Sequence, residues 1–217
     1  MASYSQSGED RIIDYFIGTT GLQNATYLDI GSSHPVWGNN TYLLYRRGLR
    51  GVCVDPSPGL ADLYKIHRSD DVFIPNAVIA GEEGDATMHL FGVSAINTVN
   101  DDNAKQFAGF GFEIKGSCRV GATNLELLCS QIGGNGPDII CIDIEGLDLA
   151  VLTHADFTRW RPKVICVEVV YYLPNKEPAI DKRFEQILGR NGYFKYADTY
   201  INQIFVDRTF QSRQRLF

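Results

Sequence analysis

Four short apolar runs of this 217-residue sequence each end in a carboxylate, and these acids are the residues best placed to do chemistry. They are Asp29, Asp55, Asp143 and Glu168. Short apolar runs are typical of buried strands, and the ligands of an open α/β sheet bind beyond the carboxyl ends of its parallel strands. The four acids are therefore expected to line one nucleotide-like pocket.

The first two runs carry further signals of such a pocket. Asp29 is followed by Gly31 and two hydroxyl residues, and a glycine at a strand end lets the backbone approach a ligand closely. Asp55 closes the second run, where an acid is placed to accept hydrogen bonds from ribose hydroxyls. These two positions predict a loop that binds a cofactor and an acid that binds its ribose.

Several short motifs resemble those of FkbM-type methyltransferases, which are S-adenosylmethionine-dependent enzymes of the class I fold. The matching pieces run through most of the chain in the family's order: Ser5-Gln6-Ser7-Gly8-Glu9-Asp10, Asp29-Ile30-Gly31, Asn40-Thr41 with Arg46-Arg47-Gly48, residues 51–56, and residues 142–146. Many class I enzymes have a second glycine where this chain has Ser33. The resemblance implies a Rossmann-like α/β fold with a mostly parallel seven-stranded sheet, helices on both faces and an antiparallel C-terminal strand.

The resemblance also implies S-adenosyl-L-methionine as cofactor and a set of residues that bind it. The expected set is Gln6, Glu9, Asp29, Gly31, Ser32, Asn40, Thr41, Asp55, Pro56, Asn76, Ala77 and Asp143. Asn76 and Ala77 follow the third predicted strand, where class I enzymes commonly contact adenine, although Asn76 fits a turn equally well. Gln6 and Glu9 would belong to a first helix that covers the cofactor, or would simply cap and solvate that helix.

S-adenosylmethionine carries the reactive methyl group, so the protein must mainly align the acceptor and remove its proton. A neutral hydroxyl acceptor needs a general base, often His, Asp or Glu. The candidates after the first, fourth and fifth strands are His34, Asp143, Glu145 and Glu168. Because histidine is neutral near neutral pH without a large pKa shift, His34 is the first choice for the base, and Asp143 is the second.

Asp143 and Glu145 could instead hold a divalent metal, since carboxylate oxygens suit magnesium. Side chains alternate along a strand, so the two acids share one face only if the backbone stays extended as far as Glu145. The sequence does not decide this point, and chemistry without a metal is the prediction.

Composition excludes several classes of partner. The formal net charge of −6 disfavours nonspecific binding to nucleic acid. No apolar run approaches the roughly 20 residues that a membrane helix needs, and no basic-then-apolar signal segment opens the chain. The expected location is therefore cytoplasmic, with no membrane span, and the five cysteines are expected to be reduced thiols, mostly in the core.

The elements that must position these residues are predicted to form one methyltransferase domain over residues 1–217, and the sequence leaves open whether it is part of a longer protein. Helices are expected at residues 7–18, 40–48, 58–67, 124–132 and 180–190, an added strand at 86–91, and a final strand pair at 194–197 and 201–206. Residues 92–116 are expected to form a long irregular loop that contributes to the substrate wall.

The leading interpretation is an O-methyltransferase that acts on a small molecule, and the resemblance makes sugar hydroxyls of glycans or glycosylated metabolites the first expectation. The aromatic and polar residues of 94–112 and of Tyr171-Tyr172 suit a sugar, although part of them would also suit a core. A NAD-dependent Rossmann oxidoreductase is disfavoured, because Gly-x-Gly-x-x-Gly is absent after the first strand. A non-catalytic nucleotide-binding domain would need no acids at Asp143 and Glu168. Neither the acceptor nor the oligomeric state follows from the sequence.

Overall fold

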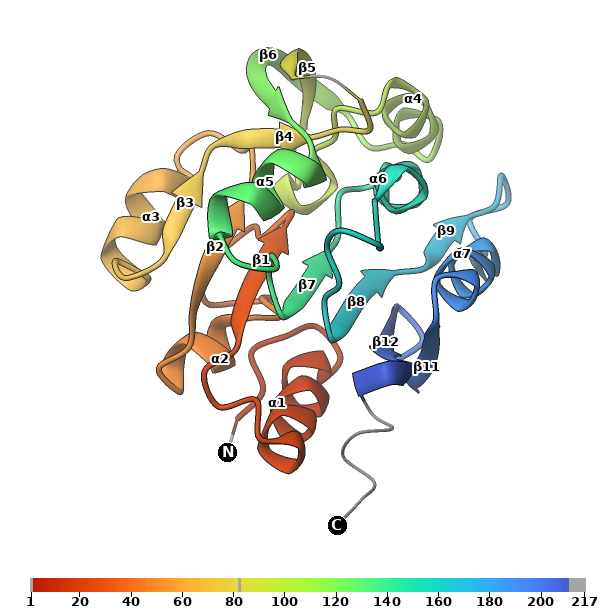
Figure 1. Ribbon diagram of the computed structural model, residues 1–217. Helices are drawn as coiled ribbons and strands as arrows, with labels where there is room; N and C mark the ends of the chain where they lie inside the picture. Colours follow the sequence, from red (N-terminus) through yellow and green to blue (C-terminus); the bar gives the residue numbers. More distant parts are fainter. Residues whose placement is uncertain (1, 82, 211–217) are drawn as a thin grey trace.

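The computed structural model describes residues 2–81 and 83–210 and has a seven-stranded sheet at its centre (Figure 1). The strand order is β11-β12-β8-β7-β1-β2-β3. The bounds are β1 Thr26–Ile30, β2 Arg50–Val54, β3 Val72–Ile74, β7 Ile139–Ile142, β8 Val164–Glu168, β11 Tyr193–Asp198 and β12 Asn202–Asp207. Every pairing is parallel except the two that involve β12. The predicted seven-stranded sheet with an antiparallel C-terminal strand is therefore confirmed.

The register of the sheet places the ends of its central strands in one row. Ile30 lies opposite both Val54 and Ile142, and Ile142 lies opposite Val167. The residues that follow these positions in the chain are Gly31, Asp55, Asp143 and Glu168. Because parallel strands end at the same edge of a sheet, four residues far apart in the sequence meet at this edge.

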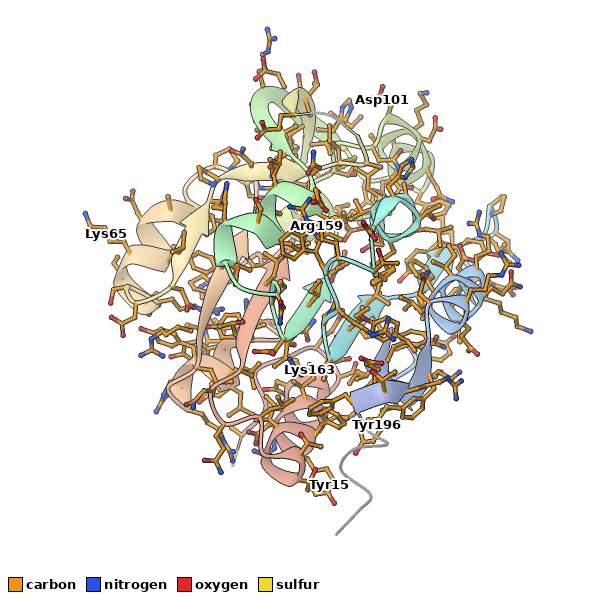
Figure 2. The ribbon with its side chains drawn as sticks, viewed as in Figure 1. Tyr15, Lys65, Asp101, Arg159, Lys163 and Tyr196 are labelled. Atoms are coloured by element: carbon orange, nitrogen blue, oxygen red, sulfur yellow. The ribbon has the colours of Figure 1, made fainter. Side chains whose placement is uncertain are left out.

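Helices cover both faces of the sheet, because strand side chains alternate between two apolar clusters. On one face, Tyr27 and Cys53 pack in the cluster that includes residues of α1 Glu9–Thr20, α2 Tyr42–Arg46 and α3 Leu60–His67. On the other face, Leu28 and Ile30 pack in the cluster that includes residues of α5 Leu125–Ile132, α6 Asp148–His154 and α7 Arg183–Arg190. Exposed charged side chains such as Lys65 and Asp101 lie on the periphery (Figure 2).

A second, three-stranded sheet stands beside the main sheet, in the order β4-β6-β5. Its strands are β4 Asn76–Val78, β5 Gly84–Phe91 and β6 Ile114–Thr123. The third predicted strand is thus divided between the two sheets, since β3 pairs with β2 whereas β4 pairs with β6.

The predicted irregular segment at residues 92–116 is largely ordered, which corrects the sequence-based expectation. It contains the short helix η1 Ser94–Ile96, the helix α4 Asp101–Gly109 and the start of β6. The side chain of Asn100 caps α4 by accepting from the backbone N–H groups of Asp102 and Asn103. Phe107 packs against Phe91 of β5, so a small apolar cluster fixes α4 to the second sheet.

Residues 170–180 contain a hairpin of β9 Val170–Tyr172 and β10 Pro178–Ile180. The first helix also begins later than predicted, at Glu9, because Gly8 has a φ of 92° and interrupts the helical backbone. Among the helices that the structure describes, none combines the length and the apolar character that crossing a membrane requires.

Candidate active site

The row of strand ends opens into a cavity of about 290 Å³ between the main sheet and the second sheet. Eight of the residues singled out in the sequence line it: Gln6, Gly31, Asp55, Pro56, Ala77, Asp143, Glu145 and Glu168. Trp37, Met88 and the η1 segment complete its wall. The lining combines strand-end acids with apolar side chains, as in many small-molecule sites.

Asp55 is one of the acids of this wall, and only 6% of its surface is exposed. One carboxylate oxygen accepts from the Ser33 backbone N–H at 2.9 Å, and the other accepts from Ser57 at 2.8 Å. Burial raises the pKa of Asp55, while these backbone hydrogen bonds act against that rise. Each carboxylate oxygen has a further lone pair, so Asp55 can hold both loops in place and still accept from a ligand hydroxyl.

Gly31 lines the cavity, but this position must be glycine because of the backbone that follows the neighbouring strand β7. Its φ is 74°, and a Cβ atom built at this position would lie 1.7 Å from the carbonyl oxygen of Asp143. The sequence suggested that a ligand occupies this space, whereas the structure shows protein backbone there. Any side chain at this position would push β1 and the end of β7 apart.

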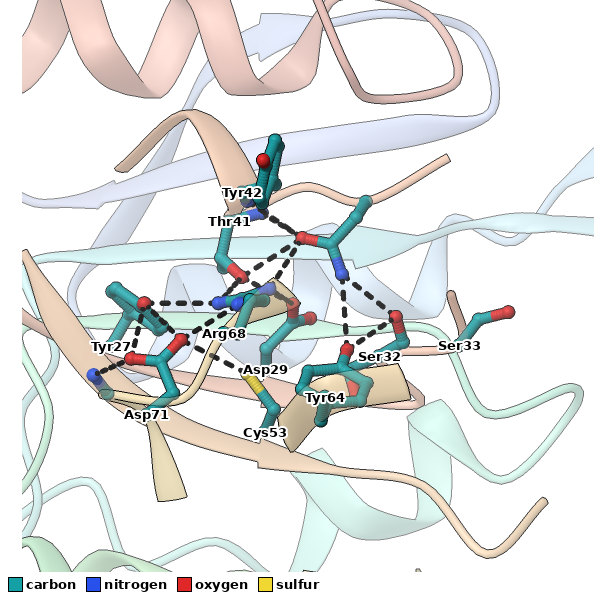
Figure 3. A network of polar contacts seen from close by, with 12 residues as sticks. Tyr27, Asp29, Ser32, Ser33, Thr41, Tyr42, Cys53, Tyr64, Arg68 and Asp71 are labelled. Atoms are coloured by element: carbon teal, nitrogen blue, oxygen red, sulfur yellow. Dashed lines mark hydrogen bonds and ion pairs between the residues drawn. The ribbon is translucent and has the colours of Figure 1, made fainter. Parts of the chain in front are cut away.

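A buried polar network centred on Arg68 supports the loop after β1 from behind (Figure 3). The Arg68 guanidinium donates to Asp71 at 2.8 Å, to Tyr27 at 3.0 Å and to Thr41 at 2.9 Å. Thr41 in turn donates to Asp29 at 2.6 Å. Burial raises the pKa of Asp29, and the positive charge of Arg68 opposes that rise. Asp29 and Thr41 thus lie in a network under the cavity and are not among its lining residues.

Asn39 connects this network to the loop after β1. Its side-chain amide donates to the backbone carbonyl of Ser32 at 2.8 Å, and its oxygen accepts from Arg68 at 3.0 Å. Tyr64 also donates to the Ser32 carbonyl, at 3.1 Å. Arg68 could not be identified from the sequence, because an arginine near the end of a helix is ordinary and no neighbouring residue marks it as buried.

Four other residues expected to bind the cofactor lie away from the cavity lining: Glu9, Ser32, Asn40 and Asn76. Ser32 is buried, and its hydroxyl lies 3.5 Å from the carbonyl of Val54. Glu9 is fully buried and accepts from Thr199 and Asn202, so it links α1 to the start of β12 and the turn before it. Asn76 lies against Gly121 of the second sheet. Asn40 keeps a buried Oδ1 atom without a hydrogen-bond partner in the part of the chain that the structure describes, so this atom is available to a ligand or water.

His34 does not line the cavity either, and its ring serves the local turn. Its Nδ1 atom accepts from the backbone N–H groups of Val36 and Trp37, both at 3.1 Å. The ring lies 6.4 Å from the ring of His67, and partial burial lowers the pKa of His34. The prediction that His34 is the general base therefore finds no support in this geometry.

The carboxylates of Asp143, Glu145 and Glu168 form a cluster at the end of the cavity, with one oxygen of each within 4.8 Å of the others. Burial, followed by repulsion from Asp148, raises the pKa of Asp143 to about 7. Burial and the charge of Asp143 raise the pKa of Glu145 to about 9 and that of Glu168 to about 11. The cluster therefore retains protons at neutral pH, and Asp143 is its most acidic member.

A tight turn after β7 brings Glu145 back toward Asp143. The strand ends at Ile142, and Glu145 has a left-handed φ of 49°, so the two acids do not share the face of an extended strand. The buried carboxylate of Asp148 accepts from the backbone N–H groups of Ile144 at 3.1 Å and Gly146 at 3.2 Å, which holds the turn. Such a left-handed residue is costly and is often found at functional sites.

The three carboxylates have the chemistry of a site for a hard cation, and Glu168 completes the pair that the sequence suggested. Without a cation they are an unfavourable arrangement, because like charges at this distance repel and burial penalises each of them. A second cavity, of about 490 Å³, begins on the other side of Glu145 and Glu168 and shares these two residues with the first.

We expect Glu168→Gln to make the protein more stable at alkaline pH, because the substitution removes a buried acid. The pKa of Glu168 rises from 4.5 to about 11 on folding, so this group costs no stability below about pH 4.5 and costs progressively more as the pH rises toward 11. Thermal melting at pH values across this window should show a difference in Tm that grows with pH. A Tm difference that is the same at all pH values would contradict the shifted pKa.

The sheet order, the glycine loop after β1, the acid after β2 and a shared cavity define a class I S-adenosylmethionine-dependent methyltransferase. The family model described as the methyltransferase FkbM domain matches residues 29–195. The chain therefore belongs to the FkbM methyltransferase family, as its motifs suggested.

Comparison with solved structures gives distant similarities. A 1,6-didemethyltoxoflavin N1-methyltransferase from Burkholderia thailandensis shares 10% sequence identity, with 93% of this chain and 77% of that chain covered and a TM-score of 0.44. A TehB-like S-adenosylmethionine-dependent methyltransferase from Corynebacterium glutamicum shares 13% identity, with 93% and 88% covered and a TM-score of 0.44. A search of curated proteins finds no match.

Proposed function

We propose that this protein is an S-adenosylmethionine-dependent O-methyltransferase that methylates a sugar hydroxyl of a glycan or a glycosylated metabolite. The observation that carries the proposal is the carboxylate cluster at the junction of two cavities. A hydroxyl acceptor has to lose a proton, and a basic group at the junction is placed to take it.

The residues of the smaller cavity fit S-adenosylmethionine. Asp55 can accept from the ribose hydroxyls, Gln6 and the backbone at Gly31 can bind the amino acid part, and Ala77 with Met88 offers apolar surface to the adenine. The bound cofactor would supply the electrophilic methyl group on its sulfonium. The other tasks, namely aligning the acceptor and removing its proton, belong to this chain.

The cluster acts as the base in this proposal, without a metal. Glu145 and Glu168 line both cavities, so either can contact an acceptor hydroxyl in the larger one. Asp143, with a pKa of about 7, supplies the negative charge that the cluster carries at neutral pH. A base whose pKa lies near the working pH combines the correct protonation state with a useful driving force for proton transfer.

The residues around the larger cavity support a sugar as acceptor. Phe107, Tyr171 and Tyr172 offer aromatic faces, while Asn103 and Gln106 offer amide groups. Sugars present apolar ring faces together with many hydroxyls, and sites for them need both kinds of contact. The experiment is transfer of labelled methyl from S-adenosylmethionine to a panel of glycosides. A product that is an N-methylated or C-methylated compound, rather than a methyl ether, would contradict the proposal.

We expect Asp55→Ala to weaken S-adenosylhomocysteine binding by about 1–3 kcal/mol, since the substitution removes charge-assisted hydrogen bonds to the ribose. Isothermal titration calorimetry measures this change. Asp156→Ala is the matched control, because Asp156 accepts from the backbone N–H of Thr158 two residues on, as Asp55 does from Ser57, but is exposed and outside the cofactor cavity. Equal affinity of the two folded variants would remove Asp55 from the site.

A further inference from the structure

The larger cavity is a site with walls from four separate elements. α4 contributes Gln106 and Phe107, and α6 contributes Thr153. The strand β9 contributes Tyr171 and Tyr172, and the start of α7 contributes Arg183 and Phe184. Figure 1 shows these elements on the side of the molecule where β8 leads into β9. Its volume of about 490 Å³ exceeds the 290 Å³ of the cofactor cavity, which leaves room for a separate ligand.

Two side-chain contacts join opposite walls of this cavity. The Gln106 amide donates to the backbone carbonyl of Tyr172 at 2.6 Å, and Lys176 Nζ donates to the carbonyl of Phe110 at 2.8 Å. The rings of Phe110 and Tyr172 also meet edge to face, with centroids 6.4 Å apart. The hairpin β9–β10 and the end of α4 are thereby held together across residues that are far apart in the sequence. The cavity is therefore already formed before a ligand arrives, which lowers the entropic cost of binding.

The charges that face the cavity disfavour an anionic ligand. Arg183 is the cation that α7 contributes to the cavity lining, and its guanidinium is already paired with both oxygens of Asp181 at 2.9 Å. On α6, Nδ1 of His154 lies 2.8 Å from the carbonyl of Ala150.

Three further acids line the cavity, namely Glu145, Asp148 and Glu168, and Asp148 holds the turn that carries Glu145. A carboxylate or phosphate on the ligand would find no free cation among the cavity residues named here, and the negative charge that the clustered acids share would repel it.

The structure assigns the larger cavity as the acceptor site and its occupant as an uncharged carbohydrate ring, held between the aromatic side chains of α4 and β9 with one hydroxyl at Glu145 and Glu168. This assignment rests on the proposed function. It goes beyond it in placing the acceptor and in excluding uronic acids and sugar phosphates as preferred substrates. Tyr171 and Tyr172 are 48% and 44% exposed, so their rings are accessible to a ligand.

The test places a large side chain on α6 so that it fills part of the cavity. We expect Thr153→Trp to weaken binding of a neutral methyl glucoside by about tenfold or more, since the indole would occupy the space of the ring. Thr19→Trp is the matched control, because Thr153 and Thr19 are both exposed helical residues whose hydroxyls donate to the carbonyl four residues earlier, and Thr19 lies outside the cavity. Saturation-transfer NMR on the full chain loaded with S-adenosylhomocysteine measures binding of the glycoside, and calorimetry measures the affinity for S-adenosylhomocysteine.

The expected result is normal cofactor affinity in both variants, with loss of the glucoside signal only in Thr153→Trp. The matched methyl glucuronide should bind the wild type more weakly than the glucoside. Equal or tighter binding of the glucuronide, or a glucoside signal that survives Thr153→Trp, overturns the assignment and leaves the proposed function intact. No binding of either glycoside to the wild type overturns both. Should Thr153→Trp fail to fold, Tyr171→Ala provides the same comparison from the opposite wall.

Discussion

Replacing Arg68 by methionine is expected to lower the free energy of unfolding by about 3–5 kcal/mol, the cost of breaking a buried ion pair from one side. The Arg68 side chain is fully buried, and so is that of its partner Asp71, 2.8 Å away. Methionine has a similar length and fills much of the same space, so the change reports on charge and hydrogen bonding rather than on a large cavity. The carboxylates of Asp71 and Asp29 would be left buried without their cation.

Urea denaturation measures this loss, and Arg119→Met is the control. Arg119 donates to Asp85 at 2.8 Å, but the two side chains are 79% and 53% exposed, and an exposed pair contributes at most about 1 kcal/mol. A loss in Arg68→Met no larger than that in the control would show that the network does not support the fold.

The same variant should also weaken cofactor binding if it folds, because Arg68 holds Asn39, whose amide binds the Ser32 carbonyl in the loop after β1. This effect separates support of the site from support of the fold. An Arg68→Met variant that loses stability but binds S-adenosylhomocysteine with wild-type affinity would show that the network supports the fold and not the site.

Turnover should fall by about a hundredfold or more in Glu168→Gln, because the substitution removes a member of the base while keeping the shape of the side chain. Glu168 lines both cavities and lies within the cluster of Asp143 and Glu145. Affinity for S-adenosylhomocysteine should change little, since Asp55 and the loop after β1 carry that binding. Methyl transfer at saturating cofactor is the measurement, and His34→Ala is the control, because His34 lies outside the lining of both cavities.

The pH dependence of turnover tests the same cluster. Burial and the charge of Asp148 raise the pKa of Asp143 to about 7, so the fraction of the cluster that can accept a proton increases as the pH rises through about 7. Turnover should follow this rise in the wild type, and Asp143→Asn should lose that limb of the profile. Full activity of Glu168→Gln would refute the assignment of the cluster as the general base. Loss of activity with a chelator would instead show that the three acids are metal ligands.

The central sheet could be predicted from the sequence, because its signal is local. A parallel strand buried on both faces is a short continuous apolar run, and the acid or glycine that follows it marks its end. The runs that end before Asp55 and Asp143 appear in the structure as β2 and β7, with the register that brings their ends together. The FkbM motifs lie at these same ends, so the fold and the family followed from the same residues.

Which residues form the site was decided by the tertiary structure. The sequence placed His34, Asp29 and Gly31 in one loop, but the chain after β1 turns so that His34 serves its own turn and Asp29 belongs to the buried network of Arg68. No local pattern marks Arg68, since its burial is the sum of contacts from Tyr27, Thr41 and other distant residues. The sequence also did not show that position 31 must be glycine because the carbonyl of Asp143 occupies the space of a side chain.

The ordered structure of residues 92–116 could not be predicted from the sequence, because α4 is a short helix fixed by Phe91 and by pairing of distant strands rather than by a strong apolar period. What the sequence determined by itself is the sheet, the edge at which ligands bind and the family, since each is encoded in short runs of neighbouring residues. Only the tertiary structure decided that Glu145 turns back to join Asp143 and Glu168, because their meeting depends on a left-handed backbone turn and on the register of two strands.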